Sequence, residues 1–160
     1  VALEILVAQY EQGDLKTKEC IAKFYIKHRR YVNNWDLVDT SAAYILGDYF
    51  YNNDTKKLFA FAESRNMWER RIAIVTTHGF IRKNRFEETL QIAEILLGDN
   101  HDLIHKAVGW MLREVGKRSL ETETQFLDKH YQIMPRTMLR YAIERFPEKQ
   151  RMHYLKNNAL

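Results

Sequence analysis

Apolar residues recur at helical spacing along the whole chain, and short polar turns separate the periodic segments. No stretch alternates apolar and polar residues for long enough to indicate a strand, so the pattern predicts about ten short helices and no sheet. Residues typical of helix N-caps stand before several apolar runs, at Asp14, Asn34 and Asn66. The predicted helices cover residues 1–12, 15–30, 35–51, 56–65, 67–79, 85–97, 102–117, 121–131 and 136–146, with a last one after Pro147.

Three of these segments are similar to one another. In each, a basic residue is followed by a small apolar group, and these basic residues, Arg71, Lys106 and Arg140, stand 35 and 34 positions apart. That period is typical of paired-helix repeats, although basic-then-apolar pairs also recur by chance in amphipathic helices. We therefore predict an all-α fold in which HEAT-like antiparallel helix pairs stack as a short curved solenoid. It would form a single domain over residues 1–160, with its function on the extended concave surface.

The composition agrees with a helical fold and excludes several classes of protein. Only 6 Gly and 2 Pro occur in 160 residues, which argues against a sandwich or barrel, and 46% hydrophobic residues argue against disorder. No apolar run approaches the ~20 residues of a membrane-spanning helix. The one cysteine, Cys20, cannot form an internal disulfide, so we expect a cytoplasmic setting and a small core residue at that position. Neither a metal-ligand cluster nor a glycine-rich phosphate loop is present, so no metal or cofactor is predicted.

The formal net charge of +4 becomes informative only if basic residues share one face. Five apolar residues of the helix over 102–117 form its core-facing stripe, namely Ile104, Val108, Met111, Leu112 and Val115. Trp110 falls outside that stripe, on a line with Lys106, Arg113 and Lys117. Cations beside an aromatic ring are typical of nucleic-acid surfaces, where they bind phosphates while the ring contacts sugar or base. Alternatively, Trp110 packs against the next repeat and the cations extend around it.

The start of the helix over 35–51 places a carboxylate on an apolar surface. Trp35 and Asp39 are four positions apart and so share a side of the helix, which continues with alanine and leucine. An isolated carboxylate in such a place needs a partner. Arg71 of an adjacent repeat can supply a salt bridge, or Asp39 can serve catalysis, and the spacing alone leaves both open.

A second basic line lies in the helix over 67–79. Arg70 and Arg71 stand in its first turns, where the helix dipole disfavours positive charge, so an anion should compensate them. Arg71, His78 and Arg82 follow one line along this helix if it continues past residue 79. Two neighbouring basic lines, each beside a tryptophan, favour a groove for a polyanion over a merely solvated surface.

Three sequence blocks, in this order and spacing, resemble the signature of AlkD-type DNA alkylation repair proteins. They are NWDLVD at 34–39, WERR at 68–71 and KAVGWMLRE at 106–114. These relatives are HEAT-like repeat DNA glycosylases that excise N3- and N7-alkylated purines. The resemblance covers nearly the whole chain. Nothing corresponds to the family's additional N-terminal helices, so we expect these 160 residues to be the C-terminal two-thirds of a longer chain.

The resemblance implies roles for particular residues. Asp39 is similar to the catalytic carboxylate, Trp35 and Trp110 to the aromatic pair beside it, and Arg71 to the basic residue near the scissile sugar. Phosphate contacts are expected from Arg113, Lys106, Lys117, Arg82 and Arg70. The implied protein is a monofunctional alkylpurine glycosylase that acts as a monomer on alkylated double-stranded DNA, without metal, cofactor or membrane. The alternative is a noncatalytic repeat scaffold that binds nucleic acid or an acidic protein through the same groove.

Overall fold

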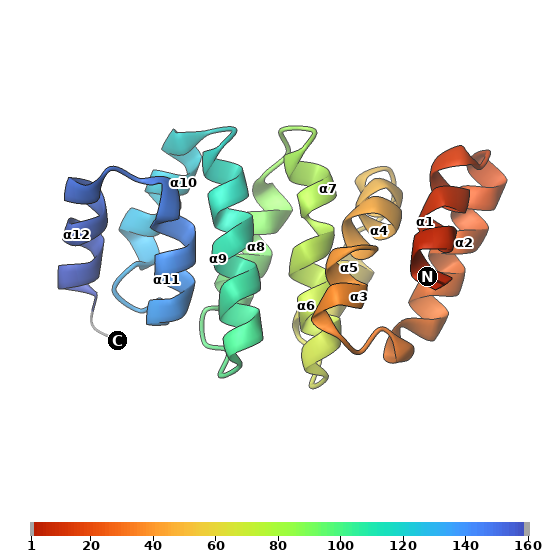
Figure 1. Cartoon of the computed structure of the whole chain (residues 1–160), viewed down its shortest axis with the longest axis horizontal. Coiled ribbons are helices and arrows are strands. Elements are labelled where there is room, and N and C mark those ends of the chain that lie inside the picture. Colours follow the sequence, from red (N-terminus) through yellow and green to blue (C-terminus); the bar gives the residue numbers. More distant parts are fainter. Residues whose placement is uncertain (1, 159–160) are drawn as a thin grey trace.

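The computed structural model describes residues 2–158, and over that range the chain is all-helical, with twelve α-helices, two short 3₁₀ helices and no strand (Figure 1). The first helices are α1 (Ala2–Gln12), α2 (Leu15–His28), η1 (Arg29–Tyr31), α3 (Trp35–Asp39), α4 (Ala42–Tyr51) and α5 (Lys56–Ala62). The middle of the chain forms α6 (Met67–Thr76), α7 (His78–Ile81), α8 (Glu87–Leu96) and α9 (Asp102–Gly116). The last are α10 (Leu120–His130), α11 (Arg136–Ala142), η2 (Ile143–Arg145) and α12 (Glu148–Asn157).

The helix predicted over 35–51 is two helices, α3 and α4. Between them, the hydroxyl of Thr40 donates to the carbonyl of Asp36 at 2.7 Å, and that of Ser41 donates to the carbonyl of Leu37 at 2.5 Å. Side chains that bond back to the preceding turn compete with the helical backbone bonds and bend or break the helix. The break turns α4 away from α3. Both helices pack against α6, and α4 also packs against α2 and α7.

A second break replaces the helix predicted over 67–79 with α6 and α7. It falls at Thr77, whose hydroxyl donates to the carbonyl of Ile74 at 2.7 Å. At the N-termini of α2, α3, α6 and α10, a side-chain oxygen accepts a hydrogen bond from a backbone N–H of the first turn. The predicted N-caps are confirmed at Asp14, Asn34 and Asn66.

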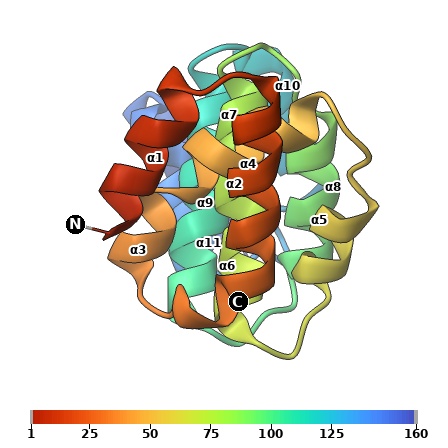
Figure 2. The same ribbon diagram turned by 90° about the vertical axis from the view of Figure 1, so that its right-hand side faces the viewer.

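The helices form two layers (Figures 1 and 2). One layer begins beside α1 and consists of α3, α4, α6, α7, α9 and α11. The second layer lies behind it and consists of α5, α8 and α10. Helix α9 packs against α6 on one side and α11 on the other. The three similar sequence segments fall on α6, α9 and α11, so the predicted helical-repeat solenoid is confirmed. We call the surface of α3, α6, α7, α9 and α11 that faces the viewer in Figure 1 the front face.

The core runs continuously between the two layers. All five residues of the predicted apolar stripe of α9 are fully buried. The expectation for Cys20 is wrong, because its side chain is exposed on α2. The buried positions of α2 are Ile21, Ala22, Tyr25 and Ile26, and position 20 lies outside this set.

Glycines set the spacing of the front helices at two crossings. A Cβ on Gly79 would lie 2.7 Å from Cα of Gly47, so the backbones of α4 and α7 touch where they cross. Likewise, a Cβ on Gly109 of α9 would lie 2.5 Å from Cβ of Tyr141 in α11. No larger residue allows two backbones to approach so closely.

Candidate nucleic-acid interface

The centre of the site is an ion pair between Asp39, the last residue of α3, and Arg71 in the second turn of α6. Nε of Arg71 donates to Oδ1 of Asp39 at 3.0 Å, and Nη2 donates to Oδ2 at 2.7 Å. The remaining nitrogen, Nη1, donates to the carbonyl of Leu103 at the start of α9. Arg71 is therefore buried and fixed by two neighbouring helices, as the salt-bridge alternative for Asp39 anticipated.

Asp39 keeps an open edge despite this pair. Its side chain is 19% exposed, whereas that of Arg71 is 6% exposed. A carboxylate offers about four acceptor positions, and the two bonds from Arg71 leave the others for a water molecule or a ligand. The arrangement presents a carboxylate of fixed orientation to the solvent.

Trp35 lies at the opposite end of the same short helix. Asn34 caps this helix by accepting from the N–H of Asp36 at 3.1 Å, which places Trp35 in the first helical position. Its side chain is 53% exposed, and four positions later Asp39 follows on the same side. An exposed indole beside a fixed carboxylate is available to a ligand that carries a flat or cationic group.

Trp110 is half-buried and belongs to a polar cluster between α7 and α9. Its ring centroid lies 5.7 Å from that of His78, and its Nε1 donates to Oε1 of Glu114 at 3.1 Å. Lys117 donates to the same oxygen at 2.6 Å. Two causes lower the pKa of His78 below its ordinary value. Burial is the larger cause, and the positive charge of Arg82 is the second, so this imidazole is mainly neutral at pH 7.

The other predicted cations of the front face are paired with neighbours from the chain itself. Lys106 forms an ion pair of 2.7 Å with Asp102, and Arg113 forms one with Glu144 in η2. The guanidinium of Arg82 lies 4.6 Å from the ring centroid of Tyr44. Arg82 is exposed, and the side chain of Lys106 is 40% exposed, so phosphates can compete with their present partners. The side chain of Arg113 is 19% exposed, so a phosphate would reach only part of it.

Arg70 is separated from this group. Its guanidinium holds Asp99 at 2.5 Å and also donates to the carbonyls of Ser64 and Arg65. Successive residues of a helix point about 100° apart, so Arg70 and its neighbour Arg71 have different surroundings. Arg71 therefore contacts Asp39. Arg70 instead connects the loop before α6 with the loop before α9.

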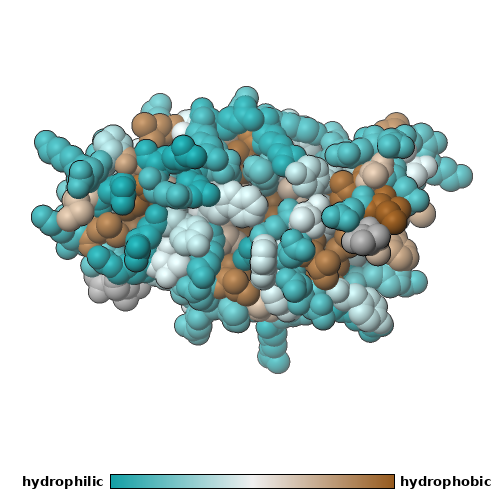
Figure 3. Space-filling view, in the orientation of Figure 1, coloured by the Kyte–Doolittle hydropathy of each residue, from teal (hydrophilic) through white to brown (hydrophobic). Residues whose placement is uncertain are grey.

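The hydropathy of the front face changes from its middle to its edges. Side chains of intermediate hydropathy gather near its middle, over α6 and α9, and hydrophilic ones surround them (Figure 3). The sequence analysis did not single out Tyr44. This residue is 37% exposed, and the guanidinium of Arg82 lies over its ring. Position 44 lies outside the buried residues of α4, which are Ala42, Ala43, Ile45, Leu46, Gly47 and Phe50.

The described residues contain neither a metal-ligand cluster nor a membrane-spanning helix. Within residues 2–158, no group of His, Cys, Asp and Glu side chains could hold a metal ion. Over the same range, no helix has the length and apolar character that crossing a membrane requires.

The fold defines the class of the molecule as an all-helical repeat protein. Residues 1–146 match the family of DNA alkylation repair enzymes, and the chain belongs to that family. A solved structure titled "Predicted DNA alkylation repair enzyme from Enterococcus faecalis" is similar, with a TM-score of 0.68 over 92% of this chain and 67% of that one. The two sequences are 16% identical, so this likeness concerns the fold. No curated protein matches the chain. Family membership gives the chain a role in DNA alkylation repair.

Proposed function

We propose that this chain is a monofunctional alkylpurine DNA glycosylase, which hydrolyses the N-glycosidic bond of cationic N3- or N7-alkylated purines in duplex DNA. The observation that carries the proposal is the fixed carboxylate of Asp39, partly exposed beside the exposed ring of Trp35. Membership of the DNA alkylation repair family supports it. A DNA substrate also agrees with the cytoplasmic setting expected from the sequence.

The chemistry needs few protein groups. An alkylated purine is already cationic and leaves without a strong general acid. As the C1′–N bond breaks, its electron pair goes to the purine and positive charge develops on the deoxyribose. Asp39 would oppose that charge and accept a hydrogen bond from the water whose oxygen attacks C1′. The attacking water gives its proton to the free oxygen lone pair of Asp39, which passes it to the solvent, and the purine leaves as a neutral base.

Arg71 would act as a positioning residue. Its guanidinium is buried and all three nitrogens are engaged, with Asp39 and with the carbonyl of Leu103. It therefore holds the carboxylate in one orientation and is not itself available to a phosphate. This refines the role implied by the resemblance, which placed Arg71 near the scissile sugar.

The remaining residues would bind the DNA around the lesion. Trp35 and Trp110 offer ring faces to a cationic sugar and help to exclude water. Four surface cations, Lys106, Arg113, Lys117 and Arg82, would bind phosphates in place of their present partners. Arg70 is left out of this proposed contact because Asp99 and two carbonyls already occupy its guanidinium.

A noncatalytic scaffold is the second candidate, and one observation favours it. The bidentate geometry of Arg71 and Asp39 is also that of an ion pair which only joins two helices. On this hypothesis the same face binds nucleic acid or an acidic protein, and no base is released.

The test is release of free base from duplex DNA that contains 7-methylguanine. The unaltered chain should release it, and Asp39→Asn should abolish release while DNA binding in a gel-shift assay stays nearly unchanged. Asp99→Asn is a matched control, since Asp99 forms the corresponding pair with Arg70 away from the front face. No release by the unaltered chain would leave the scaffold as the function. Equal release by Asp39→Asn would remove Asp39 from the proposed mechanism.

A further inference from the structure

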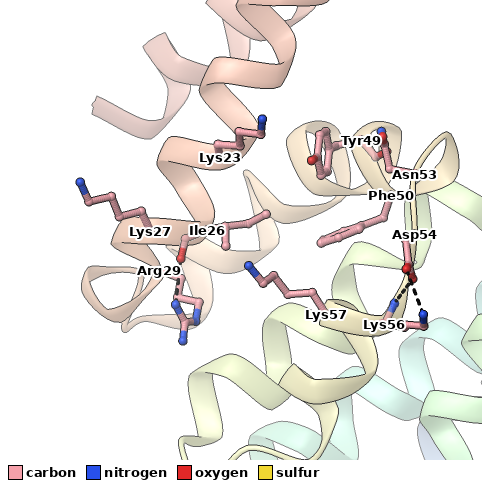
Figure 4. A pocket seen from close by; sticks show the side chains of 10 residues that line it. All are labelled: Lys23, Ile26, Lys27, Arg29, Tyr49, Phe50, Asn53, Asp54, Lys56 and Lys57. Carbon is pink, nitrogen blue, oxygen red and sulfur yellow. Dashed lines mark hydrogen bonds and ion pairs between the residues drawn. The ribbon is translucent and has the colours of Figure 1, made fainter.

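A second cleft, with a volume of about 690 Å³, lies between α2, η1, α4 and α5 (Figure 4). In Figure 2, α1 and α3 lie on one side of α2 and α5 on the other, and the cleft opens on the side of α5. Its volume falls within the range of about 300–1,000 Å³ that is usual for small-molecule sites. None of the residues assigned to the front face lines it.

Apolar and aromatic side chains form the inner walls of this cleft. The helical period of α2 brings Ile26 to this side, and α4 contributes Tyr49 and Phe50. Ile26 and Phe50 point toward one another from opposite walls (Figure 4). Asn53 at the end of α4 donates from Nδ2 to the carbonyl of Tyr49 at 2.7 Å, which leaves its Oδ1 as an acceptor.

The rim of the cleft is strongly basic. Its lining includes five cations and one carboxylate. Three of the cations have carboxylate partners, Lys23 with Glu19, Lys56 with Asp54 and Arg29 with Glu69. Among the residues that the structure describes, no carboxylate forms an ion pair with Lys27 or Lys57. Lys57 extends from α5 into the space between the walls (Figure 4).

We propose that this cleft binds a nucleoside phosphate, with its phosphates beside Lys57 and its base against Ile26 and Tyr49. Lysines are common phosphate ligands, and an aromatic ring offers a stacking surface to any base. A bare inorganic anion would not need the apolar walls, and a purely apolar ligand would not need the cations. The combination favours a ligand that carries both a phosphate and a flat ring.

Isothermal titration calorimetry with ADP, inorganic pyrophosphate and adenosine tests this proposal on the whole 160-residue chain, at about physiological ionic strength. ADP should bind more tightly than either of its parts. Lys57→Ala should weaken ADP binding about tenfold, as expected for the loss of one charged hydrogen bond. Tyr49→Leu should weaken ADP binding and leave that of pyrophosphate unchanged. The control is Lys149→Ala, at an exposed lysine of α12, which should have no effect.

Three results would overturn the proposal. They are no binding of ADP, equal affinity for pyrophosphate and ADP, or an equal loss of affinity in Lys57→Ala and Lys149→Ala. The second would indicate an anion site only, and the third a diffuse attraction of charge. The assay contains no DNA, so its outcome does not depend on whether the front face excises bases.

Discussion

Arg71 binds both carboxylate oxygens of Asp39, at 3.0 and 2.7 Å, and uses its last nitrogen on the carbonyl of Leu103. The three residues belong to α6, α3 and α9. One guanidinium therefore joins three helices of the front layer and at the same time orients the carboxylate proposed for catalysis. Changes at this pair should affect both stability and activity.

Replacement of Arg71 by lysine should lower both stability and activity. Arg71→Lys keeps the charge but loses the bidentate geometry and the bond to Leu103, so the free energy of unfolding should fall by about 2–3 kcal/mol. Base release should slow as well, because Asp39 is no longer held in one orientation. Urea denaturation and the base-release assay measure the two quantities. Arg65→Lys, at an exposed arginine, should change neither, and unchanged stability of Arg71→Lys would contradict the role given to the pair.

The stability of the fold should depend on pH through Glu123. This side chain of α10 is buried, which raises its pKa to about 8 from an ordinary value of 4.5, although the charge of Arg113 acts in the opposite direction. The folded chain thus keeps a proton that the unfolded chain has lost, so this group makes the fold less stable as the pH rises from 4.5 to about 8.

Glu123→Gln should remove that dependence. The variant should be more stable than the unaltered chain above pH 8, by up to a few kcal/mol, and about equal to it near pH 4.5. Melting temperatures measured between pH 5 and 9 test this prediction. Glu121→Gln is the control, at an exposed position of the same helix. This variant should show the same change in melting temperature between pH 5 and 9 as the unaltered chain.

The sequence predicted much of the fold because local signals agreed with tertiary packing. The apolar period over residues 102–117 predicted the buried stripe of α9. The caps at Asn34 and Asn66 predicted where α3 and α6 begin. The break after α3 was missed because the apolar spacing does not show where the hydroxyls of Thr40 and Ser41 bond. The hydroxyl of Ser41, which bonds back to α3, also lies 2.9 Å from that of Tyr25 in α2.

The candidate site was predictable only in part, for a similar reason. Arg70 and Arg71 have the same residue type and adjacent positions, so their partners cannot be told apart from the sequence. The position of Asp99, in the loop before α9, decides that Arg70 turns to it while Arg71 turns to Asp39. The pairing of Arg113 with Glu144 likewise depends on how α9 packs against η2.

Packing between α9 and α11 should be sensitive to one methyl group. Gly109→Ala would place Cβ 2.5 Å from that of Tyr141 and against the backbone carbonyl of Met138, so the helices must separate. We expect a loss of about 1–3 kcal/mol in the free energy of unfolding, measured by urea denaturation. Gly98→Ala has no atom within 4 Å of the new Cβ and should be nearly neutral. Equal stability of the two variants would mean that the close crossing is not required.

The proposed DNA contacts should be visible in the salt dependence of binding. Lys106→Ala removes a surface cation of α9, so DNA affinity should fall and the slope of log affinity against log salt should decrease by about 1. Lys149→Ala on α12 serves as the control and should leave the slope unchanged. Identical slopes for the two variants would place the DNA away from α9.

The contact of Gly47 with Gly79 has a consequence for molecular recognition. Tyr44 and Arg82 project from the two helices that cross there, and their separation is set by two touching main chains. Main chains in contact cannot be compressed as side chains can. In the proposed complex with DNA, Tyr44 and Arg82 would therefore present an aromatic ring and a cation at a fixed separation.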